Sequence, residues 1–193
     1  MQRIILFGDS ITAGATHGYP TSVYTDKLAQ ALAPREIDLM NRGVLGDNTQ
    51  GGLARLHSDV VDHDPDLVVI FFGTNDVQVP KMTLQQYQNN LEIMLKHIGA
   101  QKCILITPGI TGPSRQEHRP NEKLQQYALA TLETAKEYQV GYVDWFSEAV
   151  KHSASEILQD DDLHYAPRAY DLLLEKLAPL VSQKLMDQKV AGA

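Results

Sequence analysis

Apolar residues are grouped in short runs along this 193-residue chain, and longer segments of mixed character separate the runs. Residues 67–72 form the strongest run, with apolar side chains at every position, which is typical of a parallel strand that is covered on both faces. Shorter runs with strand-like composition lie at residues 3–7, 36–41, 102–107 and 140–143. The pattern therefore predicts strands that lie inside a layered structure.

The segments between these runs repeat their apolar residues at helical spacing. The clearest case is residues 83–98, where Thr83 and Gln86 form a capping box and Gly99 follows the last apolar position. Further helices are expected at 19–33, at 53–61, after the polar loop 109–120, at 145–150 and from Pro167 onward. Pro179 should kink the last helix or split it in two.

Strands and helices alternate about five times without a repeat or a break in composition. This order predicts an α/β protein with a single domain at residues 1–193, built as a three-layer α/β/α sandwich with a five-stranded parallel, flavodoxin-like sheet. Right-handed crossovers bring every loop that follows a strand to one edge of such a sheet. We therefore expect four residues from distant loops to meet there: Ser10, Gly46, Asn75 and His164.

Composition narrows the function classes. The formal net charge of −7 argues against a nucleic-acid partner, since phosphate binding needs clustered Lys and Arg. Cys103 is the only cysteine, so neither an intrachain disulfide nor a cysteine-based zinc site is possible. The apolar runs are too short for a signal-peptide core or a membrane span, which predicts a cytoplasmic protein without a membrane partner.

The turn after the first strand carries Gly8-Asp9-Ser10, and a helix-compatible segment follows within a few residues. Backbone N–H groups at such a turn point toward a bound anion. A serine hydroxyl there lies beside a site that can receive negative charge, so we interpret Ser10 as a nucleophile. It then needs a neutral base, for which histidine is suited at neutral pH.

Four segments of the chain resemble sequence blocks of the GDSL, or SGNH, hydrolase family, in the same order and spacing. The blocks are Gly8-Asp9-Ser10, residues 41–46 (Asn-Arg-Gly-Val-Leu-Gly), residues 73–76 (Gly-Thr-Asn-Asp) and residues 161–164 (Asp-Asp-Leu-His). Ile11 replaces the leucine of the four-letter motif, which is a conservative change. Any one block is common, whereas four in register are a specific signal.

The resemblance implies a serine hydrolase that needs no cofactor and no metal. Ser10 would attack the substrate, His164 would accept its proton, and an acidic residue would orient the imidazole. Asp160, Asp161 and Asp162 all lie close enough by sequence, and the family spacing selects Asp161. The oxyanion hole would consist of the backbone N–H groups of Ser10 and Gly46 and the side-chain amide of Asn75.

The resemblance favours a small-molecule ester as the partner, with a short acyl group such as acetyl or butyryl on a small alcohol, an aryl alcohol or a sugar. An acyltransferase, a thioesterase or a lysophospholipase with the same three residues remains open, because the choice depends on water access and on the acyl site. A flavodoxin-like binding module is the alternative without catalysis. It is disfavoured because Asp9 stands where a phosphate would bind.

Other polar residues have plainer interpretations. Asp9 is expected to bind loop N–H groups, and Cys103 to be a buried, inert thiol. His17 and Tyr19 follow Ser10 closely enough to border an acyl site. The remaining groups are expected to be solvated: the basic residues Arg115, Arg119 and Lys123, and the histidines and acids at 57–64, whose spacing matches no zinc motif.

Overall fold

The computed structural model describes residues 1–80 and 82–191. In this part of the chain a five-stranded parallel sheet has the order β2-β1-β3-β4-β5. Its strands are β1 (Gln2–Gly8), β2 (Ile37–Gly43), β3 (Leu67–Phe71), β4 (Cys103–Ile106) and β5 (Gly141–Val143). The predicted parallel sheet is confirmed, and β3 is buried along its whole length.

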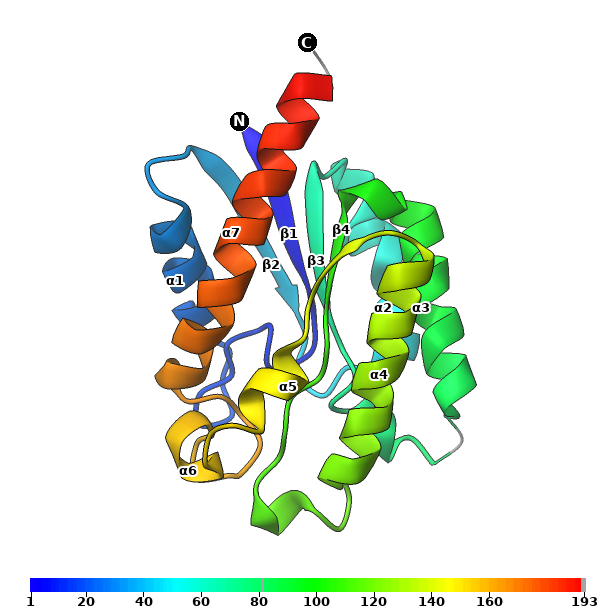
Figure 1. Cartoon of the computed structure of the whole chain (residues 1–193), viewed down its shortest axis with the longest axis vertical. Helices are drawn as coiled ribbons and strands as arrows, with labels where there is room; N and C mark the ends of the chain where they lie inside the picture. Colours follow the sequence, from blue (N-terminus) through cyan, green and yellow to red (C-terminus); the bar gives the residue numbers. More distant parts are fainter. Residues whose placement is uncertain (81, 192–193) are drawn as a thin grey trace.

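Helices cover both faces of the sheet, which gives the predicted three layers (Figure 1). On one face lie α1 (Val23–Leu32) and α7 (Pro167–Ala191), which pack against each other. On the other face lie α2 (Thr49–Asp59), α3 (Leu84–Ile98) and α4 (Asn121–Glu137). The short helices α5 (Trp145–Ala149) and α6 (Ala154–Ile157) connect β5 to the segment that leads into α7.

The carboxyl ends of the strands are aligned in one row, and this alignment positions the functional site. Gly8 at the end of β1 pairs in register with Gly43 of β2 and with Phe71 of β3. Phe71 pairs in turn with Ile106 of β4, and Ile106 with Val143 of β5. The segments that follow these residues therefore leave the sheet at the same level.

Two predicted helix boundaries are wrong, at the starts of α2 and α1. The segment predicted as a helix at 53–61 begins at Thr49, because the Asn48 side chain caps it by accepting the N–H groups of Gln50 and Gly51. Gly52 therefore lies inside this helix and not in a loop before it. A Cβ there would lie 2.8 Å from the Phe72 ring, so the missing side chain lets α2 approach the sheet.

The helix predicted from residue 19 begins at Val23, because a turn that pairs Thr16 with Tyr19 precedes it. At the far end of the chain, α7 continues through Pro179 as one helix, so the predicted split is wrong, whereas the alternative of a kink stays a prediction. Leu177 and Val181 flank this proline and are fully buried. Their packing holds the helix together although the proline cannot donate to the preceding turn.

Candidate active site

The turn after β1 places Ser10 at the row of strand ends. The Asp9 carboxylate accepts the backbone N–H of Ile11 at 2.8 Å, and the Asp9 carbonyl accepts the N–H of Ala13 at 3.0 Å. This closed turn confirms the structural role predicted for Asp9. It leaves the Ser10 side chain at the floor of the site, where the residue is 5% exposed.

Ser10, His164 and Asp161 form a chain of hydrogen bonds across 154 positions of sequence. The His164 Nε2 lies 3.2 Å from the Ser10 Oγ, and its Nδ1 lies 2.5 Å from an Asp161 carboxylate oxygen. The other Asp161 oxygen accepts the backbone N–H groups of Leu163 and His164 at 3.0 and 2.9 Å. Burial acts to raise the pKa of Asp161, but these hydrogen bonds and His164 outweigh it and hold the pKa below the usual value.

The neighbouring acids have different surroundings. Asp162 has a positive φ of 58°, and its carboxylate accepts the Ser114 N–H at 2.9 Å while its carbonyl accepts the Gly112 N–H at 2.8 Å. These bonds tie the segment around His164 to the loop 109–120. Asp160 and Asp161 line a cavity of about 380 Å³ together with residues 17, 18 and 159.

The turn after β2 carries Gly46, which has a φ of +73° that favours glycine. The Val44 N–H donates to the Gly8 carbonyl at 3.1 Å, which fastens this turn to the end of β1 beside Ser10. In the described part of the chain, no acceptor takes the backbone N–H of Ser10 or of Gly46. Neither group is therefore engaged within the described part of the protein.

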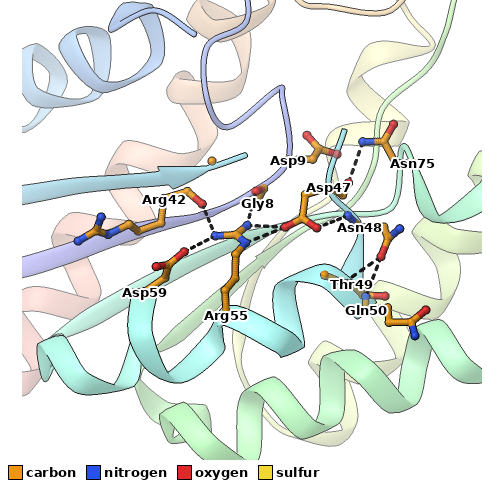
Figure 2. A network of polar contacts seen from close by, with 12 residues as sticks. Gly8, Asp9, Arg42, Asp47, Asn48, Thr49, Gln50, Arg55, Asp59 and Asn75 are labelled. Carbon is orange, nitrogen blue, oxygen red and sulfur yellow. Dashed lines mark hydrogen bonds and ion pairs between the residues drawn. The ribbon is translucent and has the colours of Figure 1, made fainter. Parts of the chain in front are cut away.

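Asn75 follows β3 and is nearly buried. Its Nδ2 donates to the Asp47 carbonyl at 2.8 Å, and its Oδ1 accepts the Arg119 guanidinium at 2.8 Å. Figure 2 shows the amide beside the segment that contains Asp47. A primary amide has two N–H bonds, so one remains after the bond to Asp47.

Arg55 of α2 holds the strand ends together, and no sequence signal pointed to it (Figure 2). Its guanidinium donates to the carbonyls of Gly8 and Arg42 at 2.9 and 2.8 Å. It also pairs with the carboxylates of Asp47 at 2.7 Å and Asp59 at 2.9 Å. A single side chain thus fixes the ends of β1 and β2 relative to the turn that contains Gly46.

Two buried carboxyl groups lie beneath this edge of the sheet. Burial raises the pKa of Asp9 to about 7 and that of Asp76 to about 6. Asp76 accepts the backbone N–H of Thr49, the Thr49 hydroxyl and the N–H of Gly73. These bonds join the start of α2 to the end of β3 and hold the segment on which Asn75 lies.

The expectation that the three basic residues are solvated is wrong for Arg119, which is 9% exposed. Besides Asn75 it contacts the Thr74 carbonyl at 3.0 Å. Arg115 donates to the Asp161 carbonyl at 2.8 Å, and Lys123 donates to the Val77 carbonyl at 2.7 Å. All three basic side chains therefore hold backbone that leads to the site.

The remaining predicted residues lie as follows. Cys103 is fully buried and burial raises the pKa of its thiol to about 12, which confirms the inert thiol. His57 lies on the surface against His97, at 3.3 Å, and His63 contacts Arg42 at 3.0 Å. His17 borders the cavity beside Asp161, whereas Tyr19 is 75% exposed.

None of the helices in the described residues is both long enough and apolar enough to cross a bilayer.

The family model of the GDSL-like lipase/acylhydrolase family matches residues 6–172. The esterase TesA of Pseudomonas aeruginosa is 31% identical over 95% of this chain and 90% of its own length. An isoamyl acetate-hydrolyzing esterase 1 homolog of Rattus norvegicus is 28% identical over 95% of this chain and 82% of its own.

A solved structure of a lipase/acylhydrolase from Enterococcus faecalis superimposes with a TM-score of 0.90 at 33% identity, over 95% of this chain and 97% of that one. The match to the family model extends from the first strand into the last helix, and the two relatives named above are esterases. The chain thus belongs to the GDSL-like lipase/acylhydrolase family.

Proposed function

We propose that this chain is a serine esterase of short-chain carboxylic esters, in which Ser10 is the nucleophile, His164 the general base and Asp161 the residue that orients the imidazole. The observation that carries the proposal is the chain of hydrogen bonds at 3.2 and 2.5 Å that joins these side chains. A serine hydroxyl becomes a useful nucleophile when such a base takes its proton during attack.

The reaction follows from this arrangement. The Ser10 Oγ attacks the ester carbonyl while its proton passes to His164 Nε2, and the Asp161 carboxylate stabilises the imidazolium that forms. The negative charge on the carbonyl oxygen is received by the two open backbone N–H groups and the Asn75 amide. The alcohol leaves with the proton from His164, and water then repeats the cycle on the acyl-enzyme to release the acid.

The space behind the histidine supports a short acyl group. Tyr165, the next residue, is buried, and its ring packs against those of Phe71, Trp145 and Tyr170. The Trp145 indole N–H donates to the Tyr165 hydroxyl at 2.6 Å, which closes this cluster. This packing leaves no room for an acyl chain between these rings. The relative from Rattus norvegicus is named for an acetate ester, which also supports small acyl groups.

Hydrolysis of p-nitrophenyl acetate by Ser10→Ala tests the nucleophile. We expect kcat to fall at least about 10³-fold, because background catalysis by the oxyanion donors is all that remains. The matched control is Ser155→Ala, since Ser155 is an exposed serine on α6. Equal turnover of Ser10→Ala and the parent, with both folded, would remove Ser10 from the mechanism.

A fluorophosphonate probe tests the base independently of turnover. Labelling should map to Ser10 by peptide mass spectrometry and should be lost in His164→Ala, because the hydroxyl is then no longer activated. Labelling that persists in that variant would mean that another group is the base.

A series of p-nitrophenyl esters from acetate to octanoate tests the acyl range, with a thioester of the preferred acid alongside. We expect kcat/KM to fall beyond about four carbons, since additional methylenes find no apolar site to fill. A steady rise with chain length would contradict the short-chain preference and leave the nucleophile unaffected.

A further inference from the structure

The orientation of the Asn75 amide is fixed by partners on both of its ends. A guanidinium can only donate hydrogen bonds, so the Asn75 atom 2.8 Å from Arg119 must be the amide oxygen. The Asp47 carbonyl can only accept, so the atom 2.8 Å from it must be the amide nitrogen. Without Arg119, the bond to the Asp47 carbonyl would be the one contact left among the described residues to hold the amide in this orientation.

Arg119 reaches Asn75 from the loop 109–120, 44 residues further along the chain. Its Nε also donates to the Thr74 carbonyl at 3.0 Å, so the two contacts hold both the backbone and the side chain of the 74–75 segment. A fork of this kind requires the planar geometry of arginine, because a lysine ammonium is a single point of contact.

The positive charge of Arg119 is not neutralised by direct contact. Arg119 is 9% exposed, and no carboxylate among the described residues forms an ion pair with it. Asp9 acts on it through space, and burial raises the pKa of that carboxyl to about 7, so Asp9 is protonated over part of the neutral range. A buried cation with neutral contacts polarises the amide that it touches, since the local dielectric is low.

We propose that Arg119 is a positioning residue for the oxyanion hole: it holds the Asn75 amide with its N–H toward the reacting carbonyl and strengthens that N–H by polarisation. The inference rests on the proposed function, because it assumes that Asn75 donates to the oxyanion. Arg119 touches no reacting atom. Its effect is therefore expected in the transition state and not in substrate binding.

The test compares Arg119→Met, Arg119→Lys, Asn75→Ala and the double variant Arg119→Met/Asn75→Ala on p-nitrophenyl acetate. We expect Asn75→Ala to lose about 10²–10³ in kcat. Arg119→Met should lose about 10- to 100-fold in kcat with KM nearly unchanged, and Arg119→Lys should recover part of that loss through its charge. The double variant should be no slower than Asn75→Ala, because Arg119 acts through Asn75.

The inhibition constant of phenylboronic acid distinguishes a positioning role of Arg119 from a general destabilisation of the fold. Its serine adduct is tetrahedral and anionic, so binding should weaken in Arg119→Met by about the same factor as kcat falls. Arg3→Met is the matched control, since Arg3 is also a partly buried, hydrogen-bonded arginine but lies near the opposite end of the sheet. It should change neither kcat nor boronate binding in the folded protein.

The outcomes separate the two proposals. Losses in Arg119→Met and Asn75→Ala that multiply in the double variant would overturn the positioning role and leave the esterase mechanism intact. An unchanged kcat in Ser10→Ala would overturn the mechanism itself. Should Arg119→Met not fold, the cycle of Arg119→Lys with Asn75→Ala gives the same comparison.

Discussion

The buried carboxyl of Asp9, beside Ser10, predicts how stability depends on pH. The pKa of Asp9 is about 7 in the folded protein against 3.8 for the unperturbed group. Between these values the folded state binds more protons than the unfolded state, so stability falls as pH rises through this window. The difference of about three units corresponds to about 4 kcal/mol once Asp9 is ionised in both states, above pH 7.

Asp9→Asn removes this ionisation and keeps an oxygen that can accept the Ile11 N–H. At pH 5 the cost of Asp9 is only about 2 kcal/mol, because the folded carboxyl is still protonated while the unfolded one is ionised. The variant should therefore gain about 2–3 kcal/mol over the parent between pH 5 and pH 8.5. Asp76, whose pKa burial also raises, is present in both proteins, so its contribution largely cancels.

Urea unfolding followed by circular dichroism at pH 5 and pH 8.5 measures the difference. Asp62→Asn is the control, because the Asp62 side chain is 67% exposed and should show no such change. Parallel pH profiles for Asp9→Asn and the parent would mean that Asp9 is already ionised in the folded protein at pH 5. The argument from burial would then be refuted.

Three further predictions concern substitutions of Gly8, Arg55 and Asp161. Gly8→Ala would put a Cβ 2.3 Å from a backbone carbonyl of β3, so we expect a loss of about 3 kcal/mol in urea unfolding, whereas Gly141→Ala, whose closest contact is 3.4 Å, should be nearly neutral. Arg55→Met should cost about 3 kcal/mol, because it leaves the carboxylates of Asp47 and Asp59 and two strand-end carbonyls without this donor, and a smaller loss would show that water replaces it. Asp161→Asn should lower kcat by about 10³–10⁴-fold, since an amide N–H facing His164 Nδ1 favours the wrong tautomer; a change below tenfold in p-nitrophenyl acetate hydrolysis would contradict the orienting role.

The strands β1, β3 and β4 could be predicted from the sequence because their buried residues form continuous apolar runs. The start of α2 could not. Its Gly51 and Gly52 look like loop residues, and only the approach to Phe72, which lies 20 positions away, makes a glycine suitable within the helix. The continuity of α7 through Pro179 likewise depends on tertiary packing that local propensity does not contain.

In the candidate site, too, local motifs could be predicted from the sequence and tertiary contacts could not. The proposed catalytic residues lie in short motifs, so Ser10 and His164 could be placed on loops of one sheet edge from the sequence. Arg119 could not be distinguished from a solvated surface arginine, because its burial depends on a partner 44 positions away that carries no charge. The role of Arg55 could not be predicted either, because its contacts to the strand ends are to backbone carbonyls 13 and 47 positions away.

The loop 109–120 limits how this enzyme could be redesigned. Loops beside an active site are the usual place to build a cover that changes substrate range. Here, however, Arg119 holds the Asn75 side chain and residues 112–115 hold the segment around His164. Lengthening this loop to enclose a larger acyl group would therefore disturb the Asn75 side and the His164 side of the site together. The exposed turn at His17–Tyr19 is the better position for such an insertion.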